Sequence, residues 1–140
     1  MNQTVTLQLP DETLQRYRQG AAAARKVLEE FLADRLVEAV PPLADDLPAP
    51  LQEELQELEK LEDAALWRVA QSQLPSDRQR LYHRLLAKNT QGTIVAREKE
   101  MLDALGEEAR RLTLKKAHAS LLLKWRGHRI PLREELQSSE

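Results

Sequence analysis

The chain has 140 residues, of which 41% are hydrophobic and 31% charged, and its net charge is −2. These values are typical of one or two folded domains and exclude a wholly disordered chain. Cysteine is absent, which excludes disulfides and thiolate metal ligands and favours a reducing compartment. No apolar run approaches the roughly 18 residues of a membrane span, and MNQTVTLQLP lacks the features of a signal peptide. We therefore expect a cytoplasmic protein that does not enter a membrane.

The first segment of the chain, TVTLQLPDET at residues 4–13, alternates like a half-buried strand. Its apolar and polar side chains alternate one by one: Val5, Leu7 and Leu9 against Thr4, Thr6 and Gln8. The pattern predicts a strand that ends at Pro10, a helix over residues 11–22 and a second helix over residues 27–40. A lone strand needs a partner for its backbone hydrogen bonds, and no second strand is predicted. We therefore expect residues 1–40 to form a homodimer through this strand, about a two-fold axis.

The segment VTLQLPDETLQRYRQGAAAARKVLEEFLADRLVEAV resembles the Arc/MetJ-like ribbon-helix-helix domain of small bacterial repressors and antitoxins. The resemblance implies an antitoxin-like regulator of transcription whose two-stranded ribbon enters the major groove of operator DNA. It also implies which side chains bind this DNA: Thr4, Thr6 and Gln8 at base edges, and Arg25 and Lys26 at a phosphate near the start of the second helix.

The charge of this segment leaves a second interpretation open. Residues 1–40 carry five basic and six acidic side chains, and the first ten residues carry no basic one. Phosphate neutralisation supplies most of the non-specific affinity for DNA, and this segment has little charge for it. The alternative is therefore a structural or adaptor protein that does not bind DNA, in which the ribbon serves only dimerisation.

The remainder of the chain is predicted to be helical. PPLADDLPAP, residues 41–50, has four prolines and predicts a stiff linker, followed by a helical domain at residues 51–130 and a flexible tail at 131–140. The last helix is expected from Ala96 to Arg126 and is followed by Gly127, a helix stop. The predicted fold is thus mostly α, with a ribbon-helix-helix module, a Pro-rich linker and a helical bundle or hairpin containing one long terminal helix.

The long terminal helix is predicted to have two apolar stripes on opposite sides, where a surface helix normally has one. The second stripe contains Leu114, Ala117, Leu121 and Trp125. Either a small bundle surrounds the helix, or this side binds another protein with Trp125 as an aromatic anchor. In the second case the expected partner-binding residues are Leu114, Lys115, Leu121, Lys124, Trp125 and Arg126.

Charge is unevenly distributed over this helical half. Residues 41–63 carry eight acidic and one basic side chain, whereas residues 110–133 carry eight basic and no acidic ones. Either the two blocks face each other or solvent, or one of them is a docking surface.

Three further stretches, EDAALWRVAQSQL, LLAKNTQGTIVAREKEMLD and EARRLTLKKAHASLLLKWRGH, resemble an uncharacterised bacterial family whose genes lie next to HNH-type endonucleases. The resemblance implies a toxin or endonuclease as the protein partner of residues 51–130. It agrees with an antitoxin-like dimer that binds operator DNA with its first half and a protein with its second.

No motif in the sequence predicts catalysis. The histidines at 83, 118 and 128 are not at metal-ligand spacing, and the four glycines are isolated rather than gathered in a phosphate loop. The Glu-rich segments are typical of solvated helix faces, and no Ser, His and Asp stand in a motif of nucleophilic catalysis. We therefore expect no enzymatic activity, no metal and no cofactor.

Overall fold

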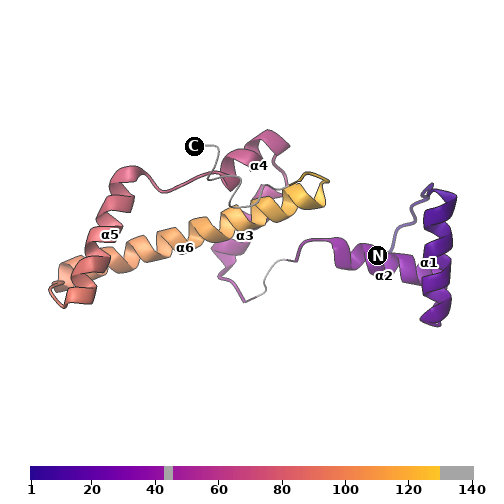
Figure 1. Cartoon of the computed structure of the whole chain (residues 1–140), viewed down its shortest axis with the longest axis horizontal. Helices are drawn as coiled ribbons and strands as arrows, with labels where there is room; N and C mark the ends of the chain where they lie inside the picture. The colour runs from indigo at the N-terminus through magenta and orange to yellow at the C-terminus, as the bar shows by residue number, and fades with distance from the viewer. Residues whose placement is uncertain (43–45, 130–140) are drawn as a thin grey trace. The chain divides into compact units, whose positions relative to one another are not determined.

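A computed structural model describes residues 1–42 and 46–129, which are mostly α-helical (Figure 1). They divide into two compact units, unit 1 at Met1–Pro41 and unit 2 at Pro42–Glu140. Residues 43–45 of the predicted linker and the predicted tail at 131–140 lie outside the described residues. The described part of the linker is not all extended, because Ala49 and Pro50 already belong to a helix.

The predicted ribbon is wrong, because the described residues contain six helices and no strand. Residues 1–10 have no regular secondary structure and are all exposed, with Val5 76% and Leu7 57% accessible. Alternation in a sequence describes the two faces of a strand but does not provide the second strand that its backbone needs. No other described segment of the chain provides one. The resemblance to a ribbon-helix-helix domain is therefore not supported by the structure.

Two helices make up the ordered part of unit 1: α1 at Asp11–Ala23 and α2 at Leu28–Ala39. Helix α1 begins directly after Pro10, whose backbone oxygen accepts a hydrogen bond from the Leu14 N–H at 2.9 Å. At its end Arg25 adopts a left-handed φ of 57°, and the Lys26 N–H returns to the Ala21 oxygen at 2.9 Å. This turn redirects the chain into α2, which crosses α1 at a steep angle (Figure 1).

Helices α1 and α2 contact each other through a small aromatic pair. The rings of Tyr17 and Phe31 lie edge to face with centroids 6.3 Å apart. Gly20 permits this approach, since a Cβ there would lie 3.3 Å from two carbons of the Phe31 ring. Ala21 is the only buried residue of α1, and α2 has none. The packing within unit 1 therefore buries very little apolar surface.

Unit 2 is organised along one long helix, α6 at Ala96–Trp125, of about 45 Å at 1.5 Å per residue. Three shorter helices pack on it: α3 at Ala49–Leu58, α4 at Asp63–Ala70 and α5 at Ser76–Gln91. Figure 1 shows α3 and α4 beside the C-terminal half of α6, and α5 beside its N-terminal half. The prolines of the sequence mark two of the helix starts, because Pro48 and Pro75 are the N-caps of α3 and α5.

The core of unit 2 has two parts, one at each end of α6. The larger part joins α3, α4 and α6 through six buried side chains: Leu55, Leu58, Leu66, Ala119, Leu122 and Leu123. The smaller part joins α5 to the first half of α6 through Leu85, Leu102 and Leu105. Gly92, with a left-handed φ of 75°, ends α5 and lets the chain turn back into α6. Unit 2 thus has its own hydrophobic core, unlike unit 1.

Candidate interaction surfaces

Helix α2 exposes most of its apolar side chains. Leu36 is 57%, Val37 73% and Val40 47% accessible, and Leu32 on the same side is half-buried. Leu32 and Leu36 are four residues apart, which places them along one side of the helix with Val37 beside them, and Val40 is the extended C-cap residue directly after the last turn. We call these four residues the α2 face. Contiguous apolar surface of this kind in a soluble protein marks an interaction site.

The predicted DNA-binding residues of unit 1 occupy two different local settings. Thr4, Thr6 and Gln8 are exposed on the irregular first segment. Arg25 lies in the turn between α1 and α2, and Lys26 forms an ion pair with Asp34 of α2 at 3.2 Å. The first turn of α2 contains two carboxylates, Glu29 and Glu30, which disfavour a bound phosphate at that helix end. The DNA-binding role of these five residues remains a prediction.

The acidic and basic blocks of unit 2 contact each other between α3 and α6. Arg111 donates two hydrogen bonds to Glu54, from Nε to Oε2 at 2.9 Å and from Nη2 to Oε1 at 2.7 Å. The hydrogen bonds from Arg111 hold the pKa of Glu54 below its usual value, and the same contact raises the pKa of Arg111. Part of the basic block is therefore occupied within the chain.

A second contact between the blocks is a polar cluster around Asp63, the first residue of α4. Arg126 donates from Nη1 to Asp63 Oδ1 at 2.9 Å and to the Leu61 oxygen at 2.7 Å, and from Nη2 to the Glu59 oxygen at 2.8 Å. His128 Nε2 lies 2.6 Å from Asp63 Oδ2. The hydrogen bonds from Arg126 and then His128 hold the pKa of Asp63 below its usual value. We call Asp63, Arg126 and His128 the Asp63 clamp, in which Arg126 satisfies backbone carbonyls at and just after the end of α3.

The two predicted stripes of α6 have different environments. Ala119 and Leu123 of the first stripe are buried, whereas Leu114, Leu121 and Trp125 of the second are 39%, 47% and 50% accessible. These three residues follow a spacing of seven and four, which places them on one side of the helix. We call them the α6 stripe. Its exposure is what a partner-binding side requires.

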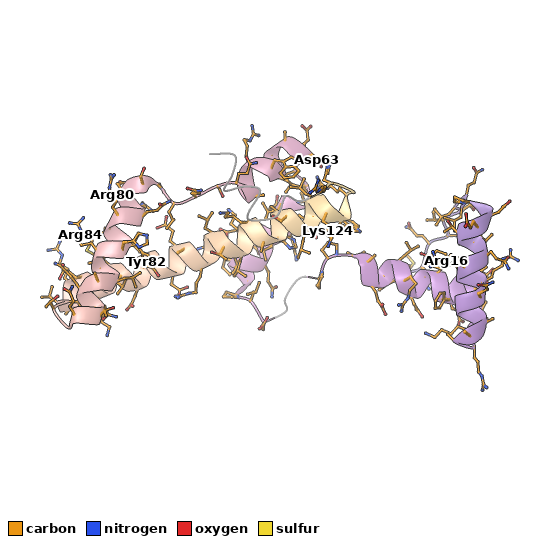
Figure 2. All side chains as sticks on the ribbon, in the orientation of Figure 1. Arg16, Asp63, Arg80, Tyr82, Arg84 and Lys124 are labelled. Atoms are coloured by element: carbon orange, nitrogen blue, oxygen red, sulfur yellow. The ribbon has the colours of Figure 1, made fainter. Side chains whose placement is uncertain are left out.

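The other predicted partner-binding residues differ in their availability. Lys124 is exposed close to Trp125, and Lys115 is half-buried beside Leu114. Arg126, by contrast, is engaged in the Asp63 clamp. Figure 2 shows Asp63 and Lys124 near the same end of α6. The structure thus gives Arg126 a role in holding unit 2 together, while the partner-binding role of all six residues stays a prediction.

A groove continues from one end of the α6 stripe. It has a volume of about 630 Å³ and lies between the start of α3 and the middle of α6. Pro48, Pro50, Leu51 and Leu114 provide its apolar lining, and Glu107 and Arg110 are among its charged residues. Such a mixture of apolar lining and charged edge suits the insertion of an apolar side chain from a partner helix.

His118 is the buried polar residue of α6. Its side chain is 6% accessible, and its Nε2 has no hydrogen-bond partner, the nearest carboxylate oxygen being Glu59 Oε1 at 4.0 Å. Burial lowers its pKa, and the nearby Glu59 offsets this in part.

Within the described ranges, no group of three or more His, Cys, Asp or Glu side chains is placed to hold a metal ion. None of the helices described is long and apolar enough to cross a membrane.

One charged surface was missed by sequence reasoning, which concentrated on residues 110–133. Residues 78–97, RQRLYHRLLAKNTQGTIVAR, contain five basic side chains and no acidic one. Arg80 and Arg84 of α5 are exposed, and neither forms an ion pair with any residue at 1–42 or 46–129. The acid-free run at residues 78–97 is the signal that could have identified these two arginines. Comparing only the two most strongly charged segments of the chain does not reveal it.

Comparison of the chain with protein-family models, with curated proteins and with solved structures finds no match. The function of the chain must therefore be argued from its own surfaces.

Proposed function

We propose that the chain is a non-catalytic, homodimeric interaction protein, in which unit 1 associates with a second copy and unit 2 binds a protein partner through α6. The observation that carries the proposal is the burial within unit 1, where α1 buries only Ala21 and α2 buries no residue. A segment of about 40 residues seldom folds alone without a metal, disulfides or association. The chain has no cysteine, and its described residues contain no group of three metal-ligating side chains, so association is the route that we propose.

The energetics of unit 1 favour a second copy as the partner. Ordering a residue costs on the order of 1 kcal/mol or more in conformational entropy, and one buried alanine does not offset this for two helices. Burying a Leu or Val side chain contributes about 1.5–3 kcal/mol, so covering Leu36, Val37 and Val40 would supply a large missing contribution. In a two-fold symmetric dimer the α2 face of one copy packs against the α2 face of the other. Both faces are apolar, so each can bury the other.

The protein-binding role of unit 2 is supported by the α6 stripe. Leu114, Leu121 and Trp125 extend along one side of a helix that is otherwise anchored by buried leucines. Lys124 and Lys115 flank the stripe, so its chemistry suits an amphipathic helix with acidic residues beside its apolar ones. The groove beside Leu114 offers a pocket for one anchoring side chain.

The test compares one substitution at two places. Leu36→Asp puts a charge in the α2 face, and Leu121→Asp puts the same charge in the α6 stripe. Light scattering during size-exclusion chromatography of the full chain is expected to give the mass of a dimer for the wild type and for Leu121→Asp, and of a monomer for Leu36→Asp. Dimer masses for all three proteins would contradict the assignment of the α2 face, and a monomeric, folded wild type at micromolar concentration would contradict the proposal.

A second candidate is a DNA-binding regulator of the antitoxin type, with a toxin or endonuclease as the partner of unit 2. The observation in its favour is that Arg16 and Arg18 of α1 are exposed and, within the described part of the chain, belong to no ion pair. Together with the exposed Thr4, Thr6 and Gln8 they provide a polar and basic surface on unit 1. Binding of promoter DNA that Thr6→Glu abolishes, with the dimer intact, would support this candidate. Unchanged DNA binding by Thr6→Glu would contradict it.

A further inference from the structure

Unit 2 carries a second acid-free run of positive charge, besides the block at 110–133, that extends from α5 into the first residues of α6. Residues 78–97 contain Arg78, Arg80, Arg84, Lys88 and Arg97 without one Asp or Glu, although the chain as a whole has a net charge of −2. An acid-free basic segment in an acidic chain creates a local positive potential that attracts polyanions.

The packing of α5 determines which of these charges face outward. Leu81, Tyr82 and Leu85 pack against α6 as part of the smaller core. Arg80, Arg84, Ala87 and Gln91, at spacings of four, three and four, lie along another side of the helix, and all four are exposed. We call them the α5 stripe. Figure 2 shows Arg80 and Arg84 pointing away from α6, with Tyr82 on the side toward it.

Neither arginine of the α5 stripe forms an ion pair with a described carboxylate, and the same holds for the exposed Arg68 and Arg97 of unit 2. Lys88 pairs with Glu98 at 2.5 Å, and Arg78 pairs with Glu108. The hydrogen bond from Lys88 is the main cause of the lowered pKa of Glu98, and the charge of Arg84 adds to it, but neither Arg84 nor Arg80 forms an ion pair in the described part of the chain. In the block at 110–133, by contrast, Arg110, Arg111 and Arg126 all have carboxylate partners. Two exposed guanidinium groups without an ion pair to a described residue therefore lie one helical turn apart on α5.

We propose that the α5 stripe binds the sugar–phosphate backbone of a nucleic acid, with Arg80 and Arg84 each contacting a phosphate. A guanidinium group binds phosphate with two parallel hydrogen bonds, and its charge is the source of salt-dependent affinity. Ala87 is small and lets a backbone approach the helix between Arg84 and Gln91. His83, exposed on the neighbouring side with its ring centroid 6.4 Å from that of Tyr82, provides a ring on which a base can stack.

This inference goes beyond the protein-binding function proposed above, because it concerns a separate surface and needs neither the dimer nor the α6 stripe. It also differs from DNA binding by unit 1, since its residues all belong to α5. An acidic protein could also bind Arg80 and Arg84, but its binding would not depend on the ring of His83 or on the small side chain of Ala87. The experiment below therefore separates these possibilities.

The test measures fluorescence anisotropy of a labelled short DNA duplex and of a labelled single-stranded RNA, titrated with the full chain. We expect affinity for at least one of them to fall steeply as salt rises from about 50 to about 200 mM. Arg80→Ala combined with Arg84→Ala is expected to weaken binding about tenfold at the lower salt. The slope of log affinity against log salt should become shallower by about 1.8 for the duplex or about 1.4 for the single strand, as for two lost phosphate contacts.

The matched control is Lys60→Ala combined with Arg68→Ala. It removes the same charge from two exposed positions outside α5: Lys60, which lies between α3 and α4 and pairs with Glu57, and Arg68 of α4. This variant should keep the wild-type affinity and salt slope, and circular dichroism should show all variants to be folded. The inference would be overturned if neither nucleic acid bound at the lower salt, or if both double variants lost the same affinity. It would also be overturned if Thr6→Glu lost affinity and the α5 variant did not, or if polyglutamate bound with comparable affinity. Sedimentation of the same samples reports the dimer independently.

Discussion

Arg126 and Asp63, which are 63 residues apart in the sequence, are joined by a hydrogen bond of 2.9 Å between Nη1 and Oδ1. The same guanidinium also donates to the backbone oxygens of Glu59 and Leu61, so one side chain connects the end of α3, the start of α4 and the end of α6. Unit 2 therefore has a polar clamp in addition to its leucine core. The described residues of unit 1 instead show two surface ion pairs, one edge-to-face aromatic pair and the Arg35 guanidinium over the Phe31 ring at 5.6 Å.

The clamp predicts a specific loss of stability. Arg126→Ala leaves the carboxylate of Asp63 and two backbone oxygens without their donor, and we expect the Tm of unit 2 to fall by a few degrees. The neighbouring Lys124 is exposed and has no carboxylate partner in the described part of the chain, so Lys124→Ala should leave the Tm within about one degree of the wild type. Equal Tm values for the two variants in a thermal melt would show that the clamp contributes nothing.

The leucine core predicts opposite outcomes for two adjacent residues. Leu122 is fully buried and Leu121 is 47% accessible. Leu122→Ala is expected to lower the free energy of unfolding by about 2–5 kcal/mol, because it removes buried methyl groups and leaves a cavity. Leu121→Ala should change it by less than about 0.5 kcal/mol. Urea unfolding measures both values, and a large effect of Leu121→Ala would mean that this residue is covered rather than exposed.

The clamp also predicts how stability depends on acid. The pKa of Asp63 is lowered from 3.8 in the folded chain, so the unfolded chain binds a proton first as the pH falls. The stabilising contribution is present above 3.8 and is lost as the pH falls from 3.8 through the lowered folded pKa. Asp63→Asn cannot titrate, and its unfolding free energy should fall less steeply in this range. Urea unfolding at several acidic pH values checks this, and identical slopes would contradict the prediction.

His118 predicts a second pH effect, at higher pH. Burial lowers its pKa from 6.5, so stability is lost as the pH falls from 6.5 through the lowered folded value, because the unfolded histidine binds the proton first. His118→Leu should remove this loss and, since it eliminates an unpartnered buried nitrogen, raise the free energy of unfolding by about 1 kcal/mol at neutral pH. The exposed His83 is the control, and His83→Leu should keep the loss. If the His118→Leu variant still loses stability as the pH falls, then groups other than His118 cause the loss.

Local signals in the sequence were sufficient for most helices and insufficient for the first segment. The range predicted for the terminal helix, Ala96 to Arg126, agrees with α6 at Ala96–Trp125 within one residue, because Gly127 and the apolar spacing are local features. The alternation of Val5 and Leu7 is local too, but a strand also depends on a second strand elsewhere. The structure places these residues in an exposed irregular segment, and the pattern alone could not reveal this.

The candidate surfaces show the same division. Helical periodicity identified the α6 stripe at Leu114, Leu121 and Trp125, but could not tell which of the two stripes faces solvent, since that depends on where α3 and α4 pack. The bonds of Arg126 to Glu59 and Leu61 connect distant segments, and no local rule predicts them. The acid-free run at 78–97 could have identified Arg80 and Arg84 as candidates, but only the structure shows that they form no ion pair with a described residue.

The central claim is that the α2 face is covered by the same face of a second copy, and isotope-filtered NMR tests it most directly. A sample is prepared from equal amounts of ¹³C-labelled and unlabelled full chain, mixed under denaturing conditions and refolded together. The claim predicts nuclear Overhauser effects between labelled and unlabelled copies at the methyl groups of Leu36, Val37 and Val40. Their absence, in a folded chain that sediments with the mass of one copy, would contradict it.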